Sequence, residues 1–177
     1  MTEKSLTNEA FSTVTDNYRR LSECIENAKL KAGRTDDVHF MAVTKTVAPE
    51  IVNHAVSLGI KLLGENRVQE VLAKYDLLNP GFDIHLIGQL QTNKVKQVVG
   101  KADLIESVDS ERLLRAIDEQ AGKLGIVQDI LLEINIGEEE SKSGFGIDDI
   151  LPLVENMTEY PNVQVRGLMA IPPISHF

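Results

Sequence analysis

Residues 38–64 have the sequence VHFMAVTKTVAPEIVNHAVSLGIKLLG, which contains one strand–helix–strand unit. The apolar run 38–44 is typical of a buried strand, and Lys45 follows it. A helix begins at Pro49, because proline is favoured in the first helical turn, and a second short strand occupies 60–63. Such an alternation predicts parallel strands joined by right-handed crossovers.

The same alternation extends in both directions from this unit. A long amphipathic helix precedes it, with apolar residues from Phe11 to Ala28 and a stop at Gly33. We expect further strands at 84–87, 104–106, 129–134 and 165–170, and helices at about 67–78, 93–99, 113–117 and 150–154.

Two architectures fit this pattern: an open doubly wound sheet and a closed (β/α)8 barrel of the TIM type. No Gly-x-Gly-x-x-Gly follows the first strand, where a dinucleotide fold would need it. Polar residues recur at the ends of successive strands, where barrel active sites are assembled. They are Lys45, Glu65, Asn66, Gln89, Gln91, Ser107 and Asn135. The residues alone leave both architectures open.

Composition limits the class of protein. The chain has 177 residues, 27 acidic against 18 basic, and a net charge of −9, so nucleic acid and membrane surfaces are not expected partners. Cys24 is the single cysteine, which favours the cytoplasm, and its place in a helical pattern predicts a structural thiol. We expect a soluble protein without a signal peptide, membrane span or metal-ligand cluster.

Lys45 is the first candidate for chemistry. A lysine that closes an apolar strand is expected in a low-dielectric setting, which favours the neutral, nucleophilic amine and suits Schiff-base formation. The structural alternative is a lysine that extends from a strand end into solvent. A cofactor-free Schiff-base aldolase is another possibility for such an amine.

Other polar residues have structural interpretations of similar weight. Asn66 and Asn93 are each placed to cap the next helix. His85 points either into the barrel or onto its helix-covered face, and we interpret it as a hydrogen-bonded core histidine. Residues 141–146, SKSGFG, lack Walker spacing, so we expect a turn before a helix at about Asp148.

Several short segments together resemble the YggS/PROSC family of pyridoxal 5′-phosphate (PLP) homeostasis proteins, and they occur in the family's order along the chain. They are MAVTK (41–45), GEN (64–66), VQE (68–70), HLIG (85–88), LQ (90–91), NK (93–94), SKSG (141–144) and RGLM (166–169).

The resemblance implies a TIM-type (β/α)8 barrel related to the alanine racemase N-terminal domain, here as a single domain with about six of eight strands. It implies that Lys45 binds PLP as a Schiff base, that Asn66 and Met169 line the cofactor pocket, and that His85 belongs to a signature segment beside it. It further implies a role in vitamin B6 and amino-acid homeostasis without established catalysis, with apo PLP-dependent enzymes as possible recipients.

The chain departs from the family pattern in two places. Arg67 stands where many members have an aromatic residue. The family's C-terminal segments, which bind the cofactor's phosphate, have no counterpart before Phe177, so we expect a C-terminally truncated, incomplete barrel. Two alternatives therefore stay open: a PLP-dependent amino-acid racemase, which would need a second acid or base, and a PLP-free fragment.

Overall fold

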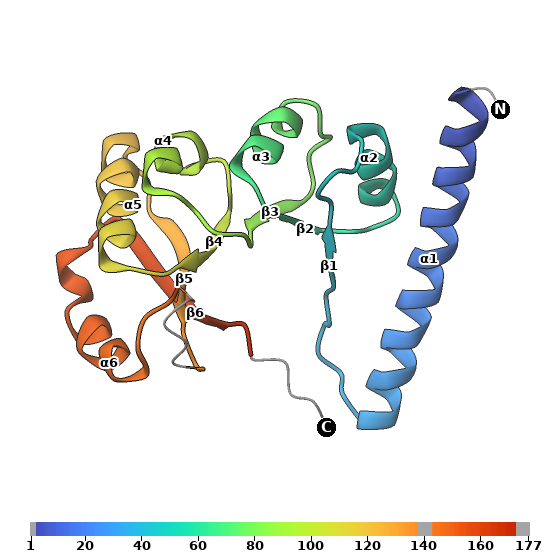
Figure 1. Ribbon diagram of the computed structural model, residues 1–177. Helices are drawn as coiled ribbons and strands as arrows, with labels where there is room; N and C mark the ends of the chain where they lie inside the picture. The colour runs from blue at the N-terminus through green and yellow to red at the C-terminus, as the bar shows by residue number, and fades with distance from the viewer. Residues whose placement is uncertain (1–2, 138–142, 173–177) are drawn as a thin grey trace.

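The computed structural model describes residues 3–137 and 143–172 (Figure 1). Within these ranges six strands alternate with helices. The strands are β1 (Met41–Val43), β2 (Leu62–Glu65), β3 (Asp83–Leu86), β4 (Leu104–Val108), β5 (Gln128–Ile134) and β6 (Val163–Ala170). The α-helices are α1 (Glu3–Ala32), α2 (Pro49–Ser57), α3 (Val68–Tyr75), α4 (Val95–Val98), α5 (Glu111–Leu124) and α6 (Ile147–Glu155). Short 3-10 helices are η1 (Thr92–Lys94) and η2 (Met157–Glu159).

The strands form one parallel sheet in which the spatial order follows the chain order, from β1 to β6. A doubly wound sheet reverses its strand order at a switch point, so this order argues against that alternative. Crossovers of one hand place their helices on one face, and Figure 1 shows α2, α3, α4 and α5 along the same side of the sheet. This is the wall of a β/α barrel, and the predicted barrel-type fold is confirmed.

The first two strands are displaced from their predicted positions. The expected strand 38–44 is reduced to β1, because only Met41–Val43 have partners in β2. The expected strand 60–63 begins two residues later, at Leu62. Gly59, at a positive φ of 115°, reverses the chain after α2, and residues 60–61 return it to the sheet. Strand length here is set by the paired neighbour, not by the apolar run.

Helix α5 has clear start and stop signals. The Ser110 hydroxyl accepts a hydrogen bond from the Leu113 N–H at 3.4 Å and so caps the first turn. Gly125 ends the helix in the left-handed conformation, with φ at 68°, which glycine adopts without a Cβ clash. Leu114 and Ile117 are fully buried on the face toward the sheet.

The main core lies between the sheet and helices α3 to α5. It includes Leu86, Ile105 and Ile130 from three different strands, all fully buried. Alternate residues of a strand face opposite sides of the sheet. On each strand, the residues adjacent to these core positions therefore point away from the helices, toward what we call the inner face. That face is where a barrel holds its interior side chains.

Helix α1 packs on a smaller cluster at the β1 end of the sheet. Val14 and Tyr18 contact the cluster that contains Val52 and Leu63. Cys24 lies in α1 as predicted, but its side chain is exposed, so the expectation of a structural thiol is wrong. Over the described ranges, no helix has both the length and the apolar content that a membrane crossing requires.

The core predicts a large difference between two leucine truncations. Leu114→Ala, at a site with no exposed surface, should lower the free energy of unfolding by about 2–5 kcal/mol through lost burial and a cavity. Leu151→Ala on α6, where the leucine is 73% exposed, should change it by about 0.5 kcal/mol or less. Urea denaturation of both variants measures this, and equal losses would contradict the described core.

Candidate functional site

The carboxyl ends of the parallel strands meet at one edge of the sheet, and the predicted site residues lie near that edge. Val43 is in register with Gly64, and the Thr44 N–H donates to the Gly64 carbonyl at 3.0 Å, so the ladder continues past β1. Lys45 and Asn66 therefore follow two neighbouring strands at the same level. Topology brings these two together although 21 positions separate them.

Lys45 lies in the turn directly after β1, and its side chain is exposed. The expectation of a low-dielectric setting for this lysine is wrong here, because β1 is an edge strand and the turn extends beyond it. Among the described residues, the Lys45 ammonium has no hydrogen-bond or ion-pair partner. A primary amine that is exposed and unpaired can reach a carbonyl compound and, when neutral, add to it.

Asn66 is half-buried at the end of β2. The prediction that it caps the next helix is wrong, since Arg67 is the N-cap residue of α3 and no side chain caps that helix. The Asn66 backbone approaches Gly88 so closely that a Cβ at position 88 would collide with the Asn66 carbonyl oxygen. Only glycine fits at position 88, and this contact fixes Asn66 at the end of the strand. Asn93 lies inside η1 and does not cap either.

His85 points to the inner face, because its neighbours Ile84 and Leu86 belong to the helix-covered core. It is in register with Gly64 of β2. Its Nδ1 lies 2.7 Å from Oε1 of Glu106 on β4, and both side chains are largely buried. The interpretation of His85 as a hydrogen-bonded histidine is therefore confirmed, and a cofactor-binding role stays a prediction.

Met169 lies on β6, the strand at the other edge of the sheet from β1. A β-bulge between Ile130 and Leu131 shifts the register of β6, so that Met169 is opposite Glu133 and half-buried. The structure thus places Lys45 after β1, Asn66 after β2 and His85 on β3, at three consecutive strands of the sheet. It does not join Met169 to them through strand pairing.

Glu133 is a buried carboxylate on the inner face that the sequence interpretation missed. Only 8% of the residue is exposed. Burial raises the pKa of its carboxyl group, and the negative charge of Asp109 raises it further. The available signal was an acidic residue that interrupts the apolar run 130–134 of the expected strand.

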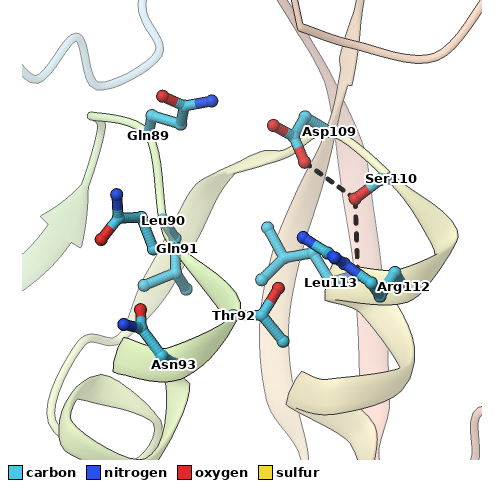
Figure 2. Close-up of a pocket in the computed structure, with 9 residues that line it drawn as sticks. All are labelled: Gln89, Leu90, Gln91, Thr92, Asn93, Asp109, Ser110, Arg112 and Leu113. Carbon is cyan, nitrogen blue, oxygen red and sulfur yellow. Dashed lines mark hydrogen bonds between the residues drawn. The ribbon is translucent and has the colours of Figure 1, made fainter.

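A hollow of about 540 Å³ lies beside the same edge, between the loop after β3 and the start of α5. Figure 2 shows Gln91, Thr92 and Asn93 on one side of it and Asp109, Ser110 and Arg112 on the other. None of the four predicted site residues lines this hollow. It is a polar neighbour of the candidate site, not the site itself.

The segment at 141–146 is described only in part. Ser141 and Lys142 lie outside the described residues. The Phe145 N–H donates to the Glu133 carbonyl at 2.8 Å, and Phe145 forms an isolated parallel β-bridge with Ile134. Helix α6 begins at Ile147, which confirms the helix expected at about Asp148, while the expected turn lies partly outside the described residues. Across residues 3–137 and 143–172, no group of three or more His, Cys, Asp and Glu side chains is arranged to hold a metal ion.

Comparison with known proteins gives a consistent answer. Residues 14–176 match the family described as "Alanine racemase, N-terminal domain". The chain is 45% identical over 156 residues to the pyridoxal phosphate homeostasis protein of Aquifex aeolicus, covering 87% of this chain and 68% of that protein. It is 33% identical over 164 residues to the pyridoxal phosphate homeostasis protein of Pseudomonas aeruginosa, covering 92% and 71%.

Solved structures agree with the fold. PipY of Synechococcus elongatus with PLP bound superposes with a TM-score of 0.72 at 33% identity, over 84% of this chain and 70% of that one. Alanine racemase of Clostridium difficile superposes with a TM-score of 0.63 over 81% of this chain and 38% of that one. At 15% identity the racemase likeness concerns the fold alone.

Glu133 gives a pH-dependent prediction. Because its pKa is raised in the folded state, protonation favours folding, and stability is lost as pH rises from the usual glutamate range through the raised value. Glu133→Gln removes this titration, so the variant should gain stability relative to the parent as pH rises through that window. Urea denaturation from pH 4 to pH 8 measures the difference. A constant difference across the range would contradict the assignment.

Proposed function

The chain belongs to the alanine racemase N-terminal domain family and to its YggS/PROSC group of pyridoxal phosphate homeostasis proteins, and from this we propose that it binds PLP as a Schiff base on Lys45. The observation that supports this most directly is the position of Lys45, which is exposed and lies at the carboxyl end of β1 without a partner among the described residues. Barrels of this type assemble their sites at that end.

Formation of this Schiff base is a simple condensation. The neutral Lys45 amine adds to the aldehyde carbon of PLP, and one water leaves as the C=N bond forms. No oxidant or reductant is needed, and an amine from another protein or an amino acid can reverse the bond by exchange. An accessible lysine suits such reversible exchange, because incoming amines reach the carbon without an opening step.

Three further residues are assigned to the cofactor in this proposal. Asn66 follows the neighbouring strand at the level of Lys45 and offers an amide for hydrogen bonding. His85, paired with Glu106, supplies a polar group on the inner face one strand further on. Met169, on β6, would contribute an apolar contact from the inner face.

We assign the protein a binding and homeostatic role in vitamin B6 and amino-acid balance, not a catalytic one. Its relatives are named homeostasis proteins, and PipY has been solved with PLP bound. Apo PLP-dependent enzymes are the recipients that this role implies. The single cysteine agrees with a reducing compartment, and we place the protein in the cytoplasm.

Lys45→Arg is the direct test, because arginine keeps the positive charge but forms no stable Schiff base with an aldehyde. Mixed with PLP, the parent chain should develop the visible absorption band of a lysine Schiff base, and borohydride should trap PLP on the peptide containing Lys45. The variant should lose both signals. Lys123→Arg, an exposed lysine on α5, is the matched control and should keep them.

Two results would overturn the proposal. The first is a Lys45→Arg protein that retains the full absorption band. The second concerns the non-catalytic role alone: conversion of L-alanine to D-alanine by the parent chain that disappears with Lys45 would make the protein a racemase-type enzyme.

The phosphate end of PLP gives a separate prediction. Barrel phosphate sites commonly follow strands seven and eight, and the described residues contain six strands. We therefore expect the 177-residue chain to bind PLP less than about tenfold more tightly than pyridoxal, which lacks the phosphate. Spectral titration with both aldehydes measures this. A preference of about a hundredfold would show that this chain has its own phosphate site.

A further inference from the structure

The turn that bears Lys45 contains an unfavourable backbone conformation. Thr46 has φ at 62°, and it is the one non-glycine residue with positive φ in the described part of the chain. This left-handed conformation is unfavourable for L-residues and is a genuine outlier for a β-branched one. Such residues persist where surrounding contacts hold them, and they gather at functional sites.

Two carboxylates hold the residues on either side of Lys45. The Thr46 N–H donates to Oε2 of Glu70 on α3 at 2.6 Å. The Thr44 hydroxyl donates to Oε1 of Glu65 on β2 at 2.7 Å. Thr46 is therefore bound to α3 and Thr44 to β2, while no described residue bonds the lysine side chain itself.

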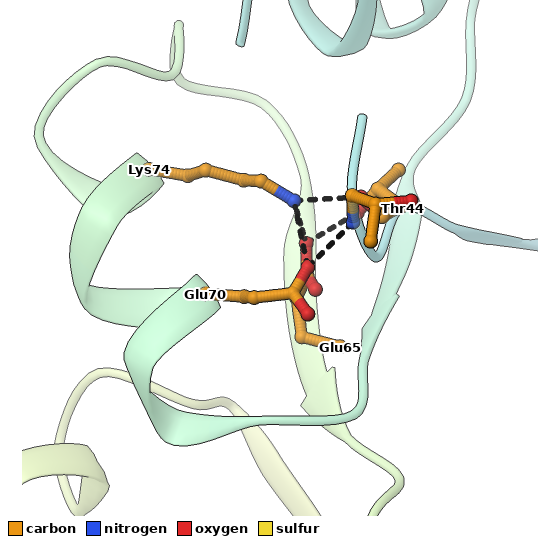
Figure 3. A network of polar contacts seen from close by, with 5 residues as sticks. Thr44, Glu65, Glu70 and Lys74 are labelled. Carbon is orange, nitrogen blue, oxygen red and sulfur yellow. Dashed lines mark hydrogen bonds and ion pairs between the residues drawn. The ribbon is translucent and has the colours of Figure 1, made fainter. Parts of the chain in front are cut away.

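Lys74 connects the two carboxylates to the same turn (Figure 3). Its ammonium donates to the Thr44 carbonyl at 2.6 Å and to Oε1 of Glu65 at 2.7 Å, and it lies 3.5 Å from Oε2 of Glu70. Lys74 is 7% exposed and Glu65 is 2% exposed, so this is a buried charged network. We call these three residues, Glu65, Glu70 and Lys74, the clamp.

A buried network of this kind is costly, because each charge must leave water and an apolar set of similar volume is often at least as stabilising. Glu65 Oε2 even lacks a hydrogen-bond partner among the described residues. The contacts that the clamp does make converge on the backbone and hydroxyl of residues 44 and 46. Its geometry thus serves the turn more than the general stability of the fold.

We propose that the clamp is a positioning device: Glu70, supported by Lys74 and Glu65, holds the turn at Thr46 in its unfavourable conformation and so directs the Lys45 side chain away from α3 and toward the aldehyde. This inference rests on the proposed function. The clamp residues touch the turn, not the cofactor, so they are positioning residues.

The electrostatics of Glu70 support this arrangement. The N–H of Thr46 is the main cause that lowers the pKa of the Glu70 carboxyl, and the Lys74 charge lowers it further against the opposing effect of burial. The ionised carboxylate is thus the form that binds the turn. Neutralising it should weaken the bond without removing the side chain.

The test compares Glu70→Gln and Glu70→Ala with Glu111→Gln, which removes a carboxylate of a distant exposed ion pair on α5. Without the clamp, we expect the left-handed conformation of the turn to be only a minor conformer. The apparent affinity for PLP then falls in proportion to the fraction of molecules that adopt this conformation. We expect PLP affinity to fall about tenfold or more in Glu70→Ala, less in Glu70→Gln, and not in Glu111→Gln. Spectral titration and borohydride trapping on Lys45 give the values.

Thr46→Gly provides a rescue that a merely structural role would not produce. Glycine adopts the left-handed conformation without the Cβ penalty, so the turn then depends less on Glu70. We expect Thr46→Gly to restore affinity when combined with either Glu70 variant. Circular dichroism shows whether Glu70→Ala folds. If it does not, the comparison of Glu70→Gln with the Glu70→Gln, Thr46→Gly double variant provides the same test.

The outcomes separate the two proposals. If the parent chain traps no PLP on Lys45, the proposed function fails. If the parent traps PLP and the Glu70 variants bind equally well, or bind weakly without rescue by Thr46→Gly, the clamp is overturned while the proposed function stands.

Discussion

Parallel pairing in sequential order is the constraint on which the rest of the structure depends. Right-handed crossovers then carry every connecting helix to the same face, so each strand buries alternate residues under helices and turns the others to the inner face. Polar pairs gather on that second face: His85 with Glu106, and Arg166 with Asp129 at 2.7 Å. Without the helix-covered core on the other side, these residues would have no common surface.

The sequence predicted those features that depend on local pattern. The order of strands and helices, the start of α2 at Pro49 and the position of Lys45 after an apolar run all follow from periodicity and residue type. The family resemblance added the cofactor and selected the barrel over the doubly wound sheet. Periodicity alone had left that choice open.

What the sequence missed depends on distant partners. β1 is short because β2 offers it only three paired residues, and no pattern within 38–44 records that. Asn66 does not cap α3 because β2 extends to Glu65, two residues beyond the expected strand end, and α3 begins one residue late, at Val68. In the clamp, the spacing of Glu70 and Lys74 at four residues is a visible helical signal. Their convergence with Glu65 on the turn appears only when β1, β2 and α3 pack together.

The exposure of Lys45 changes how its chemistry should be explained. A buried lysine can be activated by the loss of its water shell, and the apolar strand suggested that route. Here the amine is exposed at a sheet edge, so burial cannot be what distinguishes it from the other lysines of the chain. What distinguishes it is the backbone on either side of it, since Thr44 is bound by the buried carboxylate of Glu65 on β2 and Thr46 by the partly buried carboxylate of Glu70 on α3. An exposed, flexible four-carbon side chain is accessible to incoming molecules, but its amine can adopt many orientations. Fixing its Cα and Cβ is the means by which a fold can limit these orientations while leaving the amine open to exchange.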